Sequence, residues 1–407
     1  MKNLIKTVAL LMIPTIGIAF TGCSPTKVLS TGNDYVIQNN GIEYYLQGSL
    51  VIGIDKNNEL KAVGCEVNEE EKQVNIEYID NIRPLCLSEY NSVVVNNNIY
   101  KIEYGNLYKY SFTDNNYKLD EEIIDISSNF DNEYDSRSVS DLKTDGKYIY
   151  FIINPSMEYF QASSKGNYFK MGKMSLDGKD FELFDTVALS YTISDGWIYY
   201  FNNGYTANND NYSFDYEQAG LYKMKTDGSE RVELISGKIN NYNCNVFDND
   251  NTITEIKVNG DYIYFVDYSE RGEGRVCRTK KDGSDYQVIS DNTAYSIAFD
   301  TKNHMYYSHG INGTANRKIY EVSLDNMGET KLFEEPLGSP YIDCYDNYLY
   351  LSYSTYSNTS KILVGKRYDI ANKKVESIYC HYNEYEVQDD IFSSLKIEGP
   401  YLEWETE

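Results

Sequence analysis

Residues 256–266 read IKVNGDYIYFV and contain the pattern that decides the fold. Apolar residues alternate with polar ones on both sides of the Asn-Gly-Asp turn, and such alternation is typical of half-buried β-strands. Asn-Gly and Asp-Gly between two alternating runs are the strongest short-range signal for a β-hairpin, because these residues tolerate positive φ. The stretch therefore predicts two antiparallel strands joined by a tight turn.

The same hairpin recurs along the chain and is followed by a second one. Residues 194–201 (SDGWIYYF) and 144–151 (TDGKYIYF) repeat the first hairpin. Residues 221–229 (LYKMKTDGS) and 173–178 (KMSLDG) hold the turn of the second. Most copies contain an apolar residue followed by Tyr, and the second residue of this pair marks the position of the copy. These positions are Tyr100, Tyr150, Tyr199, Tyr264, Tyr306 and Tyr350, and Glu403 stands at the equivalent position in the last copy. The repeat predicts a chain built from similar four-stranded units.

Four strands in about 40–50 residues is the size of one blade of a β-propeller, so we expect an all-β propeller. The last copy, residues 395–404, supplies only two strands, and residues 50–63 would supply the rest of its blade. Strands from both termini would then close the ring, because closure removes two exposed sheet edges. Six internal blades and one shared blade make seven. A further strand at residues 42–45 would give eight, and one misread copy would give six.

The repeated unit resembles a known group of bacterial domains. Its apolar-Tyr-Tyr/Phe hairpin followed by Leu-Tyr-Lys-x-x-x-Asp-Gly-Ser resembles bacterial domains of unknown function described as similar to the propeller of low-density-lipoprotein-receptor-related proteins. It is more distantly similar to TolB-like propellers. The match covers roughly residues 90–405 and is clearest from 141 to 290, although the receptor motif Tyr-Trp-Thr-Asp is absent. The resemblance implies a propeller in an extracytoplasmic setting and carries over no catalytic residue.

Composition excludes some classes of protein. The 407 residues carry 37 Lys and Arg against 62 Asp and Glu, for a net charge of −25. A surface this acidic repels polyphosphates, which argues against nucleic-acid binding. The chain is 41% hydrophobic and contains 42 Tyr, 15 Phe and 2 Trp, so it can bury a large core and is not globally disordered.

The N-terminus has the pattern of an export signal. Lys2 and Lys6 precede an apolar run at residues 8–20 that is too short to span a bilayer comfortably. Phe20-Thr21-Gly22-Cys23 resembles the lipobox of bacterial lipoproteins, with Phe20 where the family prefers Leu. We therefore expect a signal peptide at 1–22, a lipidated Cys23 with a flexible tether at 23–34, and one propeller domain at 35–407. The alternative is an ordinary secreted protein in which Cys23 is incidental.

This organisation predicts attachment to the outer face of the bacterial cell membrane through acyl chains on Cys23. Processing would remove both N-terminal lysines and take the net charge to −27. We expect a monomer. Outside the cytoplasm the six other cysteines could form up to three disulfides, of which the sequence-near set is 65–86, 244–277 and 344–380, or they could remain buried thiols. These cysteines are Cys65, Cys86, Cys244, Cys277, Cys344 and Cys380.

Two insertions are candidate binding loops. The loop at 204–220 holds Tyr205, Tyr212, Phe214 and Tyr216 among Asn and Ser residues, and the loop at 155–167 holds Tyr159 and Phe160. Tyrosine with small polar residues combines rigid aromatic contact with adaptable hydrogen bonding, and loops on a rigid scaffold often carry binding. The alternative is an ordinary polar loop, because Tyr and Asn are abundant throughout the chain.

Catalytic signals are weak. There is no Gly-x-Ser-x-Gly motif, and the three histidines have no repeated partner carboxylate. Asp248 and Asp250 offer oxygen ligands at alternate positions, so calcium is a possible ligand, with a solvated polar linker as the alternative. No other cofactor is expected.

The sequence thus predicts a lipid-anchored, extracytoplasmic propeller that acts as a binding or scaffolding module for a glycan, peptide or envelope protein. A hydrolase or lyase acting on extracellular or cell-wall polysaccharide is the alternative. Such an enzyme would need paired carboxylates in the central funnel, at least one with a raised pKa.

Overall fold

A computed structural model shows an all-β chain. It describes residues 36–39, 42–47, 50–54, 60–63, 66–68, 73–75, 92–96, 98–103, 105–113, 116–119, 124–129, 134–155, 170–202, 205–208, 211–214, 220–236, 255–268, 274–309, 317–335, 341–345, 347–352, 361–381, 396–398 and 402–406. Within these residues the helical structure is a single 3₁₀ turn, η1 (Ser127–Asn129). The expected all-β fold class is therefore confirmed for the described part of the chain.

Most strands form antiparallel sheets of four in simple sequence order. The first half of the chain holds β1 (Val36–Asn39), β2 (Ile42–Gln47), β3 (Leu50–Ile54) and β4 (Leu60–Val63); then β7 (Ser92–Val95), β8 (Asn98–Glu103), β9 (Asn106–Thr113) and β10 (Asn116–Leu119), with β11 (Ile124–Asp125) paired to β9; then β12 (Tyr134–Thr144), β13 (Tyr148–Pro155), β14 (Lys170–Ser175) and β15 (Glu182–Val187).

The second half continues the pattern. It holds β16 (Ser190–Ser194), β17 (Trp197–Asn202), β20 (Gly220–Lys225) and β21 (Val232–Ser236); then β22 (Ile256–Asn259), β23 (Tyr262–Tyr268), β24 (Gly274–Lys280) and β25 (Gln287–Phe299); then β26 (His304–His309), β27 (Arg317–Ser323) and β28 (Gly328–Glu335); then β29 (Tyr341–Tyr345), β30 (Tyr348–Ser352), β31 (Lys361–Asp369) and β32 (Lys374–His381).

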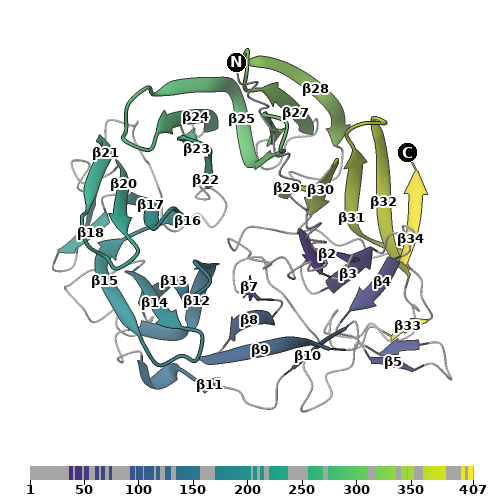
Figure 1. The fold of residues 1–407 in the computed structure, drawn as a ribbon, viewed down its shortest axis with the longest axis horizontal. Coiled ribbons are helices and arrows are strands. Elements are labelled where there is room, and N and C mark those ends of the chain that lie inside the picture. The colour runs from purple at the N-terminus through teal and green to yellow at the C-terminus, as the bar shows by residue number, and fades with distance from the viewer. Residues whose placement is uncertain are drawn as a thin grey trace, which may run out of the picture.

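These sheets are arranged around a common centre as the blades of a β-propeller (Figure 1). Strand β25 serves two blades, because residues from Gln287 to Thr293 pair with β24 and residues from Ala294 to Phe299 pair with β26. It thus ends the β22–β25 blade and begins the β25–β28 blade. A separate hairpin, β18 (Tyr205–Asn208) with β19 (Asn211–Phe214), is inserted between β17 and β20.

The repeat predicted from sequence is confirmed at the level of strand position. The six tyrosines used to count the copies all lie in the second strand of a sheet, from Tyr100 in β8 to Tyr350 in β30. Each of the six is buried. We call these residues the anchor tyrosines: Tyr100, Tyr150, Tyr199, Tyr264, Tyr306 and Tyr350.

The prediction that strands from both termini share one blade and so close the ring was wrong. Strands β1 to β4 form a complete four-stranded sheet from N-terminal residues, and β1 contacts β29 of the preceding blade. The C-terminal strand β34 (Leu402–Thr406) instead pairs with the outer edge of β32 as a fifth strand. The termini do meet elsewhere, because β33 (Lys396–Glu398) pairs with β6 (Gln73–Asn75), which also pairs with β5 (Glu66–Asn68).

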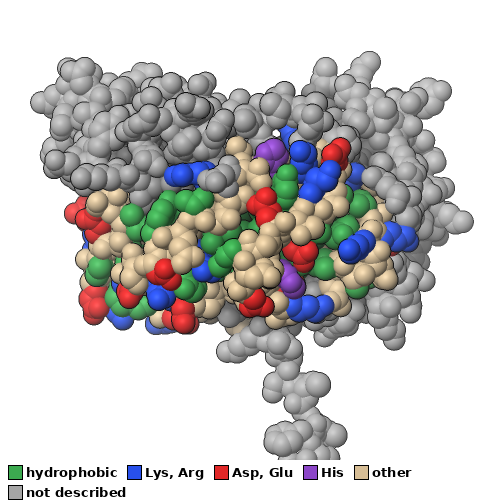
Figure 2. Space-filling view, turned by 90° about the horizontal axis from the view of Figure 1, so that it is seen from above, with side chains coloured by type: hydrophobic (Ala, Val, Ile, Leu, Met, Phe, Trp, Pro, Cys, Tyr) green, Lys and Arg blue, Asp and Glu red, His purple; other side chains and the backbone are tan. Residues whose placement is uncertain are grey.

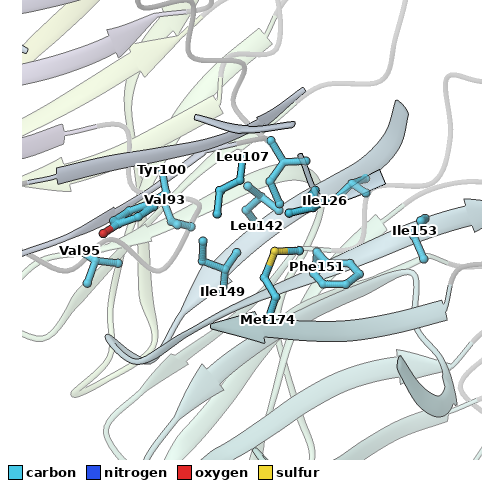
Figure 3. Packing of buried hydrophobic residues seen from close by; sticks show 12 residues of the cluster. Val93, Val95, Tyr100, Leu107, Ile126, Leu142, Ile149, Phe151, Ile153 and Met174 are labelled. Carbon is cyan, nitrogen blue, oxygen red and sulfur yellow. The ribbon is translucent and has the colours of Figure 1, made fainter. Parts of the chain in front are cut away.

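Hydrophobic clusters fill the seams between consecutive blades. In the seam between the β7–β10 and β12–β15 blades, Val93 and Tyr100 pack with Ile149, Phe151 and Met174, all at most 6% exposed (Figure 3). The other anchor tyrosines from Tyr150 to Tyr306 likewise belong to a cluster shared with the following blade. Since burying one large apolar side chain contributes about 1.5–3 kcal/mol, packing in these seams stabilises the contact between consecutive blades.

The hairpin turns differ in type although their sequences look alike. Asp195 and Gly196 both have positive φ, 53° and 75°, as the central pair of a type I′ turn requires. In the turn between Asn259 and Tyr262, Gly260 is the central residue with positive φ, 57°, as in type II′. Both types match the right-handed twist of the strands that they join.

The predicted disulfide pairs 244–277 and 344–380 are wrong, because neither Cys277 nor Cys344 forms a disulfide. Cys344 lies in the first strand and Cys380 in the fourth strand of one blade, and two strands separate them. With strands about 4.8 Å apart, that gap is too wide for a disulfide. Cys65, Cys86 and Cys244 lie outside the described residues.

Candidate functional site

The structure describes three of the predicted binding residues. Tyr205 is in β18, and Tyr212 and Phe214 are in β19. The other predicted site residues lie outside the described part of the chain: Cys23, Tyr159, Phe160, Tyr216, Asp248 and Asp250.

The β18–β19 hairpin brings the three aromatic residues together. Its register pairs Tyr205 with Phe214, Thr206 with Ser213, Ala207 with Tyr212 and Asn208 with Asn211. Opposed residues share a face of a sheet and faces alternate along each strand. Aromatic positions therefore occupy one face of this hairpin, and the other face has only Thr, Ser and Asn.

The hairpin is inserted between two strands of the β16–β21 blade, β17 and β20. Asn202 at the end of β17 pairs with Gly220 at the start of β20, just before and just after the insertion. Phe201 is 4% exposed and meets the Phe265 ring of the next blade edge-on at 5.4 Å, and Leu221 is fully buried. The hairpin is therefore inserted between two strands whose ends are buried in the blade.

The innermost strands carry polar groups that sequence reasoning missed. In β12, the Lys143 side chain is 1% exposed, is ion-paired with Asp141 and lies 4.6 Å from the centre of the Tyr191 ring of the next blade. The Tyr191 hydroxyl donates to the Asp141 carbonyl oxygen at 2.6 Å. Asp141 has φ of 51° beside an irregularity in the β12–β13 register, so the backbone is bent at this position.

A second acid–lysine pair occupies the innermost strand of the β22–β25 blade. Lys257 Nζ is 3.1 Å from Glu255, and the Ile297 backbone N–H donates to the same carboxylate at 2.6 Å. Since Ile297 is in the innermost strand of the next blade, the Glu255 side chain joins two blades. The polar groups at both positions therefore stabilise contacts between blades.

A third recurring feature is a cation stacked on an aromatic ring. Each anchor tyrosine, in the second strand of its blade, pairs with a residue of the third strand. That residue is basic in five of the six blades. In four of these blades it lies over the aromatic residue that starts the second strand, at 4.1–5.2 Å from the ring centre. The pairs are Lys173 with Tyr148, Lys223 with Trp197, Arg278 with Tyr262 and Arg367 with Tyr348.

Two of these lysines also join consecutive blades. Lys173 Nζ donates to the Thr226 carbonyl oxygen at 3.2 Å, and Lys223 Nζ donates to the Lys281 carbonyl oxygen at 2.9 Å. In each case the acceptor lies in a turn of the following blade. These two lysine side chains therefore hold consecutive blades together. Figure 2 shows acidic and basic side chains interspersed over the described part of one face.

Every carboxyl group whose pKa shifts in the described part has a lowered value. The Ser175 hydroxyl is the largest cause for Asp177, which has a pKa of about 2. The Ser229 and Ser284 hydroxyls likewise lower the pKa values of Asp227 and Asp282. These aspartates accept hydrogen bonds within tight turns, which is the role that Asp commonly has there. No raised carboxyl pKa, of the kind that glycoside cleavage needs in its acid, is resolved among the described residues.

Metal binding is not supported by the described residues, which contain no group of three or more His, Cys, Asp or Glu that could hold an ion. The proposed calcium ligands Asp248 and Asp250 lie outside that part, so calcium stays a prediction. Among the described residues no helix is long and apolar enough to cross a membrane.

No family model and no curated protein matches the sequence. Solved structures do resemble the fold. A protein of Listeria monocytogenes without an assigned function is 11% identical, with a TM-score of 0.44 and coverage of 86% of this chain and 94% of that chain. A TolB-like protein of Agrobacterium tumefaciens is 11% identical, with a TM-score of 0.36 and coverage of 61% and 81%.

A chain of the nidogen–laminin complex is 15% identical, with a TM-score of 0.37 and coverage of 68% of this chain and 91% of that chain. At these identities the likeness concerns the fold alone and carries no inference about activity. Membership of the receptor-like bacterial domains stays a prediction.

Proposed function

We propose that this protein is a lipid-anchored, extracytoplasmic β-propeller that binds a glycan, peptide or envelope protein through the β18–β19 hairpin. The observation that carries the proposal is the register of the hairpin, which places Tyr205, Tyr212 and Phe214 on one face. Aromatic faces stack on sugar rings and on apolar peptide side chains, and Tyr adds a hydroxyl for orientation. The opposite face, with Thr206 and Ser213, has no aromatic position.

The hairpin offers a matched control for a binding test. We would apply the full chain in detergent to a glycan array and to immobilised cell-wall polysaccharide. The variant Tyr205→Ser/Tyr212→Ser/Phe214→Ser should lose at least tenfold in affinity, because each stacked ring contributes about 0.5–1.5 kcal/mol. The variant Thr206→Ala/Ser213→Ala should bind as the wild type does.

Two results would count against this proposal. Equal losses in both variants would mean that the hairpin acts only as a structural element, and unchanged binding in both would place the site elsewhere. Each ligand found should also be assayed for turnover. Cleavage of a bound polysaccharide would favour the alternative of a hydrolase or lyase.

The membrane attachment rests on the N-terminal sequence and has its own test. Cys23→Ala should prevent lipidation, so the protein should be released to the medium or accumulate unprocessed. Cys344→Ala, which removes a free thiol of the folded part, should leave localisation unchanged. A processed Cys23→Ala protein that stays in the membrane fraction at wild-type level would refute the lipid anchor.

We further propose that the ring has seven blades. The six sheets that carry an anchor tyrosine account for six blades, and the β1–β4 sheet is a candidate for the seventh. Its second strand holds Tyr44 and Tyr45, which fits the repeat pattern. An electron-microscopy projection along the ring axis would give the number of blades directly.

A further inference from the structure

A stacked pair of tyrosines occupies the same position in two blades. In the β16–β21 blade, Tyr200 and Tyr222 lie opposite each other, with ring centres 5.7 Å apart. In the β25–β28 blade, Tyr307 and Tyr320 do the same at 5.0 Å. Tyr200 and Tyr307 each directly follow an anchor tyrosine. The two stacks are therefore equivalent, and their surroundings can be compared.

The two stacks differ in what covers the ring of the third strand. The Arg231 guanidinium carbon lies 4.7 Å from the centre of the Tyr222 ring, and Tyr222 is 6% exposed. Tyr320 is half-buried, and within the described residues no cation lies over its ring and no group hydrogen-bonds to its hydroxyl. The face of Tyr320 that points away from Tyr307 therefore lacks the cation that closes the equivalent ring.

The inner ring of the open stack is fixed by hydrogen bonds. Tyr307 is fully buried, and its hydroxyl donates to Glu329 Oε2 at 2.8 Å. The Asn292 side-chain amide donates to the same hydroxyl at 3.0 Å and to Glu329 Oε1 at 2.8 Å. Ser290 Oγ lies 3.0 Å from the hydroxyl as well. These contacts fix Tyr307 and, through it, the support on which Tyr320 stacks.

The register of the strands places further polar side chains beside this stack. Opposed residues of an antiparallel sheet share a face. Two rows of opposed residues cross β26, β27 and β28 on the face that holds the stack. The rows are His309, Lys318 and Glu334, and next to them Tyr307, Tyr320 and Lys331. We call these six residues the Tyr320 patch.

The charges of the Tyr320 patch are only partly paired. Lys331 Nζ lies 2.9 Å from Glu334 Oε1, and these two side chains are 47% and 61% exposed. Lys318 lies opposite Glu334, yet it forms no hydrogen bond or ion pair with any described residue. His309 meets the edge of the Tyr320 ring at 5.9 Å between ring centres. The patch thus combines an aromatic ring, one ammonium group without an ion pair and one exposed ion pair.

We propose that the Tyr320 patch binds a sugar ring that carries a carboxylate, as a uronic acid does. The C–H face of such a sugar stacks on Tyr320, and its carboxylate takes a charge-assisted hydrogen bond from Lys318. Its hydroxyls pair with the Tyr320 hydroxyl and with Lys331 and Glu334, which offer donors and acceptors. A neutral sugar would leave Lys318 without a partner.

The acidity of the whole chain does not decide this local contact. Exposed charges more than about 10 Å apart are largely screened at about 0.1 M salt. The net charge of −25 is spread over the chain, whereas Lys318 adjoins the ring directly. The site lies in a different blade from the β18–β19 hairpin, so it does not depend on the function proposed for that hairpin.

Two ligands that differ only in the carboxylate test the proposal. Cellotetraose and the tetramer of β-1,4-linked glucuronic acid have the same backbone, and only the second is charged. In calorimetric titrations of the full chain in detergent, the charged tetramer should bind at least about tenfold more tightly. Equal affinities would overturn the proposal, and so would a lack of binding of the charged tetramer at millimolar concentration.

Variants then assign the binding to the patch. Lys318→Gln and Tyr320→Leu should each weaken binding of the charged tetramer by about fivefold or more, whereas Tyr320→Phe keeps the ring and should stay within about twofold of the wild type. Lys179→Gln removes an 80% exposed lysine of another blade and should have no effect. Equal losses in Lys179→Gln and Lys318→Gln would show an effect of net charge alone and would refute the site.

The hairpin variant separates this site from the one proposed above. Tyr205→Ser/Tyr212→Ser/Phe214→Ser should bind the charged tetramer as the wild type does, even if it loses every other ligand. A loss confined to the hairpin variant, with Lys318→Gln unchanged, would place the uronic acid on the hairpin and overturn the assignment to the Tyr320 patch.

Discussion

The guanidinium carbon of Arg278 in β24 lies 4.2 Å from the centre of the Tyr262 ring in β23. The same group donates to Gln287 at 2.9 Å and to the anchor tyrosine Tyr264 at 3.4 Å. One side chain thus connects three strands of a blade. Its equivalents in three other blades, Lys173, Lys223 and Arg367, are also basic and stacked, so this relationship recurs in four of the six blades with an anchor tyrosine.

The first prediction follows from this contact. Arg278→Met keeps the apolar stem and removes the charge, so unfolding free energy should fall by about 1–2 kcal/mol. Arg278→Lys should lose less, because Lys173 and Lys223 occupy the same position elsewhere. Urea unfolding of the three proteins would measure the difference. A loss in Arg278→Lys as large as in Arg278→Met would show that the planar guanidinium, not the charge, is required.

Two glycines test the packing of the turns. A Cβ on Gly283 would lie 2.4 Å from the Leu234 carbonyl oxygen of the preceding blade, whereas a Cβ on Gly196 would have nothing within 4 Å. Both residues have positive φ, 85° and 75°. Gly196→Ala should therefore cost about 1–2 kcal/mol for backbone strain alone. Gly283→Ala should cost clearly more, and equal thermal midpoints for the two variants would contradict this contact between blades.

His309 should lower the free energy of unfolding at acidic pH. Burial is the main cause that lowers its pKa, and Lys318 adds to the shift, while nearby Glu329 acts in the opposite direction. The unfolded chain then binds the proton more tightly, so stability is lost as the pH falls below about 6.5 toward the folded value. His309→Gln should lose less stability than the wild type between pH 7.5 and pH 5.5 in urea unfolding. A larger loss in the variant would reverse the assigned sign.

The ion pair on the innermost strand of the β12–β15 blade gives a fourth prediction. Asp141→Asn should remove the carboxylate from its ion pair with the nearly fully buried Lys143 side chain, at a cost of about 3 kcal/mol. Adding Lys143→Met removes the buried charge and should recover much of that loss. Thermal unfolding of the single and double variants checks the coupling. Additive losses would mean that the two side chains do not stabilise each other.

The C-terminal strand gives a fifth prediction. Deleting residues 402–407 removes β34 and exposes the outer edge of β32. We expect a lower thermal midpoint and a greater tendency to associate, because an unpaired edge can pair with another chain. Size-exclusion chromatography with light scattering would detect the association. A monomer with an unchanged midpoint would show that β34 contributes little to the ring.

The candidate site was predictable only in part. The Tyr- and Asn-rich composition of residues 204–220 pointed to the β18–β19 insertion, but not to its register, which decides that aromatic positions share one face. The ion pairs Asp141–Lys143 and Glu255–Lys257 share a sequence pattern, an acidic residue two positions before a lysine at an innermost strand. This pattern is common in any acidic chain, so the sequence alone could not identify these two pairs.

The sequence by itself determined the local units of this protein. Alternating apolar residues around Asp-Gly and Asn-Gly turns specify antiparallel hairpins, since period and turn geometry act within a few residues. The spacing of the anchor tyrosines then located the second strand of six blades, as β8, β13, β17, β23, β26 and β30 confirm.

The tertiary structure decided which edges pair. Residues 402–406 alternate like any strand, and nothing local distinguishes the edge of β32 from that of β3 or β4 as their partner. The same holds for Glu321, which lies opposite Tyr306 where five other blades have a basic residue, and which is brought near His304 of the neighbouring strand. Hydrogen bonds and charges between strands depend on distance in space, and only the closed ring sets those distances.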